Sequence, residues 1–141
     1  MKQEKAFVFD LDGTLFETTA KEIESATGHA RYIEFADSDK LLKESKPRSL
    51  VSFALQVQKE GHKVYILTAR NSVVHGAIRN LLQRYDISPE YVFCVGDRGF
   101  DIPSYKAEIL QHLADNFKTY FWDDDEDNLA SVPDKISAFK A

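Results

Sequence analysis

Residues 6–15 have the sequence Ala-Phe-Val-Phe-Asp-Leu-Asp-Gly-Thr-Leu. The first four residues form an aromatic and β-branched run, whose length and composition favour a buried strand. Asp10 and Asp12 follow two residues apart, so on an extended segment both carboxylates face one site while Leu11 points into the core. Gly13 permits the sharp turn that carries the chain away. An Asp-x-Asp-Gly tetrapeptide alone is as typical of an ordinary turn as of a functional site, but the full string is a far more specific signal of a functional site.

Three more short apolar runs with polar bounds occur along the chain: residues 64–67 ending in Thr68, residues 91–95, and residues 119–122 ending in Asp123. Amphipathic segments separate these runs. Strands that alternate with helices predict right-handed βαβ units and a parallel sheet covered on both faces. The fold class expected is therefore α/β, a three-layer α/β/α sandwich with a mostly parallel, Rossmann-like sheet.

Helical spacing of apolar residues supports this alternation. The expected helices span residues 50–57 with Gly61 as the stop, residues 74–85 with Ser72 as the N-cap, and residues 102–113. Shorter elements are expected at 21–26 with Gly28 as the breaker, at 39–44 and at 126–131, while Ile136 and Phe139 fit either an edge strand or a frayed helix. No repeat or linker interrupts the pattern, so residues 1–141 are expected to form a single domain, with 14–47 as a short insert or flap next to the site.

The bulk composition describes an ordinary globular chain of 141 residues, 43% hydrophobic and 29% charged. Cys94 is the single cysteine, so no intramolecular disulfide forms, which fits a reducing compartment. Neither a signal peptide nor a membrane-spanning apolar run is evident, so a cytoplasmic protein with no membrane partner is expected. The net charge of -5 does not favour broad binding to duplex nucleic acid, although a local basic patch remains compatible with it.

Ligands of open parallel sheets bind beyond the carboxyl ends of the strands. Three of the four predicted strands end there in a reactive side chain, namely Asp10, Thr68 and Asp123. A sheet built only for packing has no reason to end its strands this way. A threonine such as Thr68 at the end of a strand usually has no special role, and a helix lysine such as Lys106 is usually solvated. Both become candidate site residues only through their order along the chain and the residues around them.

The ordered motifs resemble those of the haloacid dehalogenase (HAD) superfamily. Residues 6–14 match its first motif, a hydrophobic strand followed by Asp-x-Asp-Gly-Thr. Residues 65–68 resemble the second motif, Lys106 in a helix matches the third, and residues 121–124 resemble the Asp-Asp form of the fourth. The resemblance covers nearly the whole chain except residues 14–47.

The resemblance implies a HAD-type phosphatase, a hydrolase of phosphoric monoesters. Asp10 is then the nucleophile that forms an aspartyl-phosphate, and Asp12 is the general acid and base. Thr68 would donate a hydrogen bond to the phosphoryl oxygens, and Lys106 would neutralise charge on Asp10 and the phosphate. Members that only dehalogenate lack the second aspartate, so its presence favours phosphoryl transfer.

Mg²⁺ is the cofactor that the resemblance implies, because it takes oxygen ligands and keeps several waters. Its expected ligands are Asp10, the backbone carbonyl of Asp12, and Asp123, with Asp124 helping directly or through water. Asp123, Asp125 and Asp127 also alternate as in a calcium-binding EF-hand. Against that reading, positions six and twelve of the run are Asn128 and Asp134, where an EF-hand has Gly and Glu. A merely solvated acidic loop is the third interpretation.

The substrate follows less directly from the sequence. Residues 14–47 are too short for a large cap domain, so an open site suited to a bulky or polymeric substrate is expected. The pattern most resembles the phosphatase domain of bacteriophage polynucleotide kinase, which removes 3′-phosphates from nucleic acid ends. Thr68-Ala69-Arg70 replaces the expected Ser-Gly-Arg, and Asp125 stands where Arg is expected. No P-loop occurs, so no kinase domain is expected in this chain.

Three hypotheses therefore stand. The first is a phosphatase for a nucleotide or a nucleic acid end, in which Arg70 meets the leaving group or a second phosphate. The second is a phosphatase for another bulky substrate such as a phosphoprotein. The third is a non-catalytic binding protein on a HAD scaffold. Arg31, Tyr32 and Lys40 are further candidates for substrate contact, whereas His29 and His75 are expected at the surface.

Overall fold

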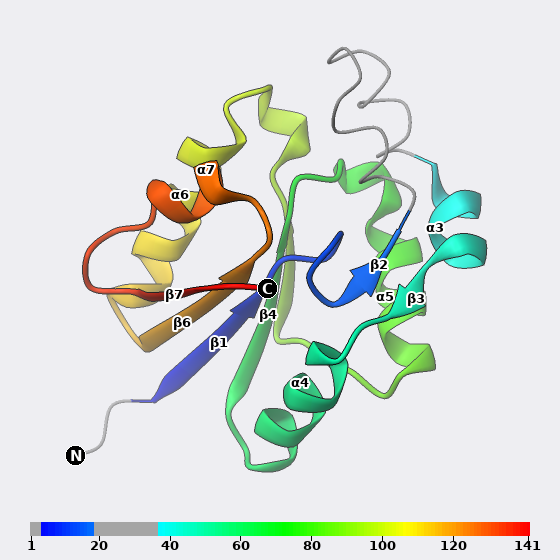
Figure 1. The fold of residues 1–141 in the computed structure, drawn as a ribbon, viewed down its shortest axis with the longest axis horizontal. Helices are drawn as coiled ribbons and strands as arrows, with labels where there is room; N and C mark the ends of the chain where they lie inside the picture. Colours follow the sequence, from blue (N-terminus) through cyan, green and yellow to red (C-terminus); the bar gives the residue numbers. More distant parts are fainter. Residues whose placement is uncertain (1–3, 19–36) are drawn as a thin grey trace.

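The computed structural model describes residues 4–18 and 37–141. In this part of the chain, five strands form one parallel sheet in the order β5-β4-β1-β6-β7 (Figure 1). The strands are β1 (Lys5–Phe9), β4 (Lys63–Thr68), β5 (Tyr91–Cys94), β6 (Lys118–Asp123) and β7 (Ser137–Lys140). All four predicted strands are confirmed, and Phe139 belongs to an edge strand rather than to a helix.

Helices cover both faces of the sheet (Figure 1). On one face lie α4 (Leu50–Lys59) and α5 (His75–Arg84), and α3 (Ser38–Glu44) packs against α5. On the other face lie α6 (Ile102–Ala114) and α7 (Glu126–Ala130). The side chains of β1 alternate between the two cores, with Phe7 and Phe9 on the α4–α5 side and Ala6 and Val8 on the α6 side. The predicted α/β/α sandwich is therefore confirmed.

The predicted N-cap at Ser72 is wrong. Ser72 begins the short 3₁₀ helix η1 (Ser72–Val74), which runs into α5, and its side chain caps neither helix. Instead, its backbone N–H donates to the Asp97 carboxylate at 3.1 Å. Asp97 lies in a second 3₁₀ turn, η2 (Gly96–Arg98), so the carboxylate at the start of η1 comes from a residue distant in sequence. The predicted stop at Gly61 agrees with the end of α4, since Gly61 has a φ of +87°.

The described ends of the 14–47 segment lie side by side. Strands β2 (Phe16–Glu17) and β3 (Lys46–Pro47) pair antiparallel, and α3 begins after an Asp37 side chain that accepts from the Lys40 backbone N–H at 3.0 Å. This helix confirms the element predicted at 39–44. The helix predicted at 21–26, its breaker Gly28, and His29, Arg31 and Tyr32 lie outside the described residues. Within the described chain, no helix is long and apolar enough to cross a membrane.

Candidate active site at the carboxyl edge of the sheet

The end of β1 places Asp10 directly beside the end of β6. Phe9 pairs with Trp122 in parallel register, and the Asp10 backbone N–H donates to the Trp122 carbonyl at 2.9 Å. This hydrogen bond continues the ladder by one residue, so Asp10 and Asp123 emerge from neighbouring strands at the same edge. Both are shielded from water, at 6% and 0% exposure.

Lys106 reaches this pair from the second turn of α6. Its Nζ lies 3.0 Å from Asp10 Oδ1 and 2.8 Å from Asp123 Oδ2, and its side chain is only 1% exposed. Burial alone lowers the pKa of this ammonium group, but the two carboxylates outweigh burial and raise the pKa above its ordinary value. Lys106 therefore places a positive charge between Asp10 and Asp123.

A single lysine does not balance the carboxylates around Asp10. Burial, and after it the charge of Asp123, raise the pKa of Asp10 well above its ordinary value even though Lys106 acts in the opposite direction. Asp124 brings a further carboxylate, and ligand atoms of Asp10, Asp123 and Asp124 lie within 4.8 Å of one another. An oxygen-rich cluster with excess negative charge matches the preference of a divalent cation such as Mg²⁺.

Gly13 lets the Asp124 carboxylate approach the turn after β1. Gly13 has a φ of +75°, and a Cβ at this position would collide with the Asp124 side chain, with Cγ at 2.8 Å. The glycine of the first motif therefore makes room for the second aspartate of the fourth. The sequence predicted a sharp turn at Gly13 but not this contact.

The acidic run at 123–128 divides into separate roles. Asp123 faces the site, where its Oδ1 accepts from the Asp125 backbone N–H at 2.9 Å and its Oδ2 accepts from Asn128 Nδ2 at 3.0 Å. Asp125 instead caps α7 by accepting from the backbone N–H groups of Asp127 and Asn128. The alternating carboxylates do not converge, so the EF-hand interpretation is wrong. Asn128 is 6% exposed and orients Asp123, a role that its sequence position alone did not reveal.

Asp12 and Thr68 also lie at the carboxyl edge of the sheet. Arg70 Nη2 donates to Asp12 Oδ1 at 2.7 Å, and Thr18 Oγ1 donates to the same oxygen at 2.6 Å. The Thr68 hydroxyl is fully buried and accepts from the Arg70 backbone N–H at 3.1 Å, so its own proton remains to be donated elsewhere. Sequence reasoning named Thr68 and Arg70 but missed Thr18, which follows the first motif without belonging to it.

The structure brings Asp10, Asp12, Thr68, Arg70, Lys106, Asp123 and Asp124 to this one edge of the sheet. Lys40 lies exposed on α3. The expectation of an open site stays a prediction, because part of the 14–47 segment lies outside the described residues. Asp10 and Asp12 are each only 6% exposed.

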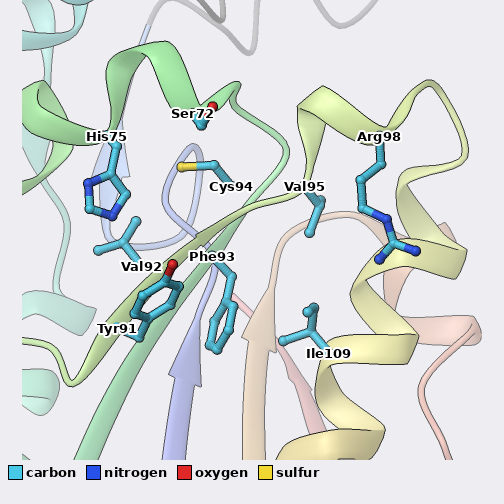
Figure 2. Close-up of a pocket in the computed structure, with 9 residues that line it drawn as sticks. All are labelled: Ser72, His75, Tyr91, Val92, Phe93, Cys94, Val95, Arg98 and Ile109. Carbon is cyan, nitrogen blue, oxygen red and sulfur yellow. The ribbon is translucent and has the colours of Figure 1, made fainter.

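A cavity of about 200 Å³ lies away from the carboxylates, around the outer edge of β5 (Figure 2). Tyr91 and Phe93 line one side, with ring centroids 4.7 Å apart, and His75 and Cys94 line the other. Cys94 is partly buried, and burial, with a smaller contribution from Asp97, raises the pKa of its thiol to about 11. Since the thiolate is the reactive form, Cys94 is not a nucleophile at neutral pH.

Alkylation of Cys94 tests this description. Iodoacetamide at pH 7.5 is expected to label the folded protein roughly two orders of magnitude more slowly than a free cysteine of ordinary pKa. Mass spectrometry over time measures the rate, and the same chain unfolded in denaturant is the control, because Cys94 is its one cysteine. Equal rates for the folded and unfolded chain would contradict the raised pKa.

No protein-family model and no curated protein matches the chain. Solved structures do. A chain of the Pnkp1/Rnl/Hen1 RNA repair complex aligns with a TM-score of 0.74 and 16% identity, over 99% of this chain and 42% of that one. The phospho-aspartyl intermediate analogue of phosphoserine phosphatase aligns with a TM-score of 0.61 and 14% identity, over 93% of this chain and 84% of that one.

A HAD family enzyme from Bacteroides thetaiotaomicron, in complex with magnesium and inorganic phosphate, also aligns with a TM-score of 0.61 and 14% identity, over 97% of this chain and 93% of that one. The protein described here spans less than half of the matched chain of the RNA repair complex. At these identities the likeness concerns the fold, and it shows that the chain has the HAD fold that its motifs predicted.

Proposed function

We propose that this protein is a Mg²⁺-dependent phosphatase of the HAD type that works through an aspartyl-phosphate on Asp10. The observation that carries the proposal is the charge arrangement around Asp10. A buried carboxylate at the end of β1 contacts Lys106 and stands within a cluster of three carboxylates suited to a divalent cation. The HAD fold, shared with the phosphoserine phosphatase intermediate analogue, supports it.

In the first half-reaction, an oxygen of Asp10 attacks the phosphorus and the bond from phosphorus to the leaving oxygen breaks. The leaving oxygen takes the electron pair and receives a proton from Asp12. In the second half-reaction Asp12 takes a proton from water, the water oxygen attacks the phosphorus, and Asp10 leaves as a carboxylate. Thr68 has a hydroxyl proton to donate to the phosphoryl oxygens, and Lys106 offsets charge on Asp10 and the phosphate.

The residues present fit Mg²⁺. Asp10, Asp123 and Asp124 would hold it together with the backbone carbonyl of Asp12, and burial together with the neighbouring carboxylates raises the pKa of Asp10. When bound, the cation offsets that charge and the charge of the phosphoryl group. Asn128 and the Asp125 backbone N–H orient Asp123 for this purpose.

Mg²⁺ is therefore expected to stabilise the folded protein. Its melting temperature rises with Mg²⁺. At a Mg²⁺ concentration one hundred times the dissociation constant, the free energy of unfolding increases by about 2.7 kcal/mol. Asp124→Asn weakens this effect because it removes a ligand and a charge from the cluster. Asp127→Asn is the matched control, since it makes the same chemical change on an exposed residue of α7. A stronger loss in Asp127→Asn than in Asp124→Asn would overturn the assignment of the ligands.

For the substrate, we propose a nucleotide or a nucleic acid end. Support comes from the likeness to a chain of an RNA repair complex, which covers 99% of this protein. Hydrolysis of p-nitrophenyl phosphate with Mg²⁺, and its loss with EDTA, tests the enzyme class first. A panel of 3′-phosphorylated and 5′-phosphorylated oligonucleotides, mononucleotides and phosphopeptides then tests the substrate. The expected preference is for a nucleic acid end, and a preference for phosphopeptides would favour the alternative of another bulky substrate.

A further inference from the structure

Arg70 forms hydrogen bonds to the Asp12 carboxylate through two nitrogen atoms. Nη2 lies 2.7 Å from Asp12 Oδ1, while Nε lies 3.2 Å from Oδ1 and 3.0 Å from Oδ2. Arg70 is 2% exposed and Asp12 is 6% exposed, so little water competes for these bonds. A planar guanidinium that engages both oxygens sets the orientation of the carboxylate as well as its charge, which a lysine does not do.

Thr18 makes the two oxygens of Asp12 unequal. Its hydroxyl donates to Oδ1 at 2.6 Å, the same oxygen that receives Arg70 Nη2. Among the described residues, Oδ2 accepts only from Arg70 Nε, at 3.0 Å. A carboxylate oxygen has two lone pairs, so Oδ2 retains the capacity to carry a proton.

The backbone of Arg70 is itself held in place. Its N–H donates to Thr68 Oγ1 at 3.1 Å, and its carbonyl accepts from the Gly96 N–H at 3.2 Å. A Cβ on Gly96 would lie 2.9 Å from the Arg70 carbonyl carbon, so only glycine permits this close approach of η2. Arg70 therefore links Asp12 to Thr68, the expected hydrogen-bond donor to the phosphoryl oxygens.

The geometry points to Arg70 and Thr18 as positioning residues for the leaving-group acid, holding Asp12 so that Oδ2 delivers the proton. This inference rests on the proposed phosphatase function and deepens it. It also assigns Arg70 differently from the sequence analysis, in which Arg70 met the leaving group or a second phosphate. A guanidinium that already binds Asp12 in a buried pair is poorly placed to take a second phosphate without giving up that pair.

The proton and charge balance is simple. When the bond from phosphorus to the leaving oxygen breaks, the oxygen takes the electron pair and the proton from Asp12 Oδ2, which leaves Asp12 as a carboxylate. Arg70 stays protonated throughout, and its two-pronged contact stabilises the carboxylate that forms. Thr18 keeps its proton and holds Oδ1 away from the reaction.

Leaving-group dependence tests the inference. We would measure kcat/KM with Mg²⁺ for p-nitrophenyl phosphate, phenyl phosphate and an alkyl phosphate. p-Nitrophenolate leaves without a proton, whereas an alkoxide needs one, so a defective acid harms the alkyl phosphate most. Arg70→Gln is expected to lose about 10²-fold on the alkyl phosphate and less than about tenfold on p-nitrophenyl phosphate. Arg70→Lys should follow Arg70→Gln, because the two-pronged contact is what matters.

Thr18 gives a milder pair of variants in case the Arg70 variants do not fold. Thr18→Val is expected to show the same selective loss of kcat/KM on the alkyl phosphate. Thr18→Ser keeps the hydroxyl and is expected to retain the wild-type dependence on the leaving group. Arg98→Gln is the matched arginine control, because Arg98 is exposed and pairs with Glu108 on the surface. Its leaving-group profile should equal that of the wild type.

A double variant completes the test. Asp12→Asn with Arg70→Gln removes both charges of the pair, and it should be no slower on the alkyl phosphate than Asp12→Asn alone. Equal losses on all three esters in Arg70→Gln and Thr18→Val would overturn the inference. With an alkyl bisphosphate as a fourth substrate, a loss confined to KM in Arg70→Gln would also overturn it, because Arg70 then binds the second phosphate of the substrate. A wild type that hydrolyses none of the esters rejects the proposed function itself, which distinguishes the two failures.

Discussion

Asp10→Asn is expected to lower the Mg²⁺-dependent hydrolysis of p-nitrophenyl phosphate by about 10⁴-fold or more, which is the scale seen when a covalent nucleophile is removed. The amide keeps the size of the side chain but is a far weaker nucleophile than the carboxylate. Steady-state rates of wild type and variant, purified side by side, measure the effect.

The Asp10→Asn variant should fold as well as the wild type. It removes one negative charge from a buried cluster in which burial, and after it the charge of Asp123, raise the pKa of Asp10. The melting temperature without metal is therefore expected to stay the same or to rise, and circular dichroism should be unchanged. Full activity in a folded Asp10→Asn protein would exclude the covalent mechanism, while an unfolded variant would show that the buried contact of Asp10 with Lys106 is needed for folding.

Lys106→Met is expected to damage both stability and activity. It leaves the buried carboxylates of Asp10 and Asp123 facing each other without their shared cation, and breaking a buried ion pair in this way costs about 3–5 kcal/mol in the free energy of unfolding. Loss of the fixed positive charge beside the phosphoryl group lowers the rate by roughly 10²–10³-fold. Denaturant titration and steady-state kinetics measure the two effects.

Lys135→Met is the matched control for Lys106→Met. Lys135 also lies 3.0 Å from a carboxylate, that of Asp115, but both side chains are about half exposed, at 52% and 54%. Water screens such a pair, so its loss should leave the denaturation midpoint and the rate essentially unchanged. Mg²⁺ is expected to restore part of the stability of Lys106→Met, since a divalent cation offsets the same carboxylates. A Lys106→Met protein as stable as Lys135→Met would show that the carboxylates do not depend on Lys106.

Much of this protein follows from local sequence. The run ending in Asp10 combines strand-forming residues with a polar stop, and the runs ending in Thr68 and Asp123 repeat that combination. Parallel strands share one carboxyl edge, so the sequence alone predicts that three side chains far apart in the chain lie together. Lys106 could be assigned to the site only from its position among the ordered motifs, because a lysine in a helix does not by itself indicate a functional site.

Only the tertiary structure decided the contacts between loops that no sequence pattern relates to one another. Thr18 and Asn128 carry no local signal, and they reach Asp12 and Asp123 only because separate loops meet at the edge. The same holds for Ser72, which caps no helix and instead donates its backbone N–H to the Asp97 carboxylate in the turn after β5.

Arg70 shows the difference most clearly. Its distance from Thr68 in the sequence suggested a residue near the site, and the structure confirms that much. Its partner, Asp12, is 58 residues away along the chain, and sequence spacing has no means of choosing between a carboxylate and a substrate phosphate. Both are anions that a guanidinium binds in the same planar geometry. Sequence determined the strands, the edge and most of the charges, whereas only the packed fold determined which charge meets which.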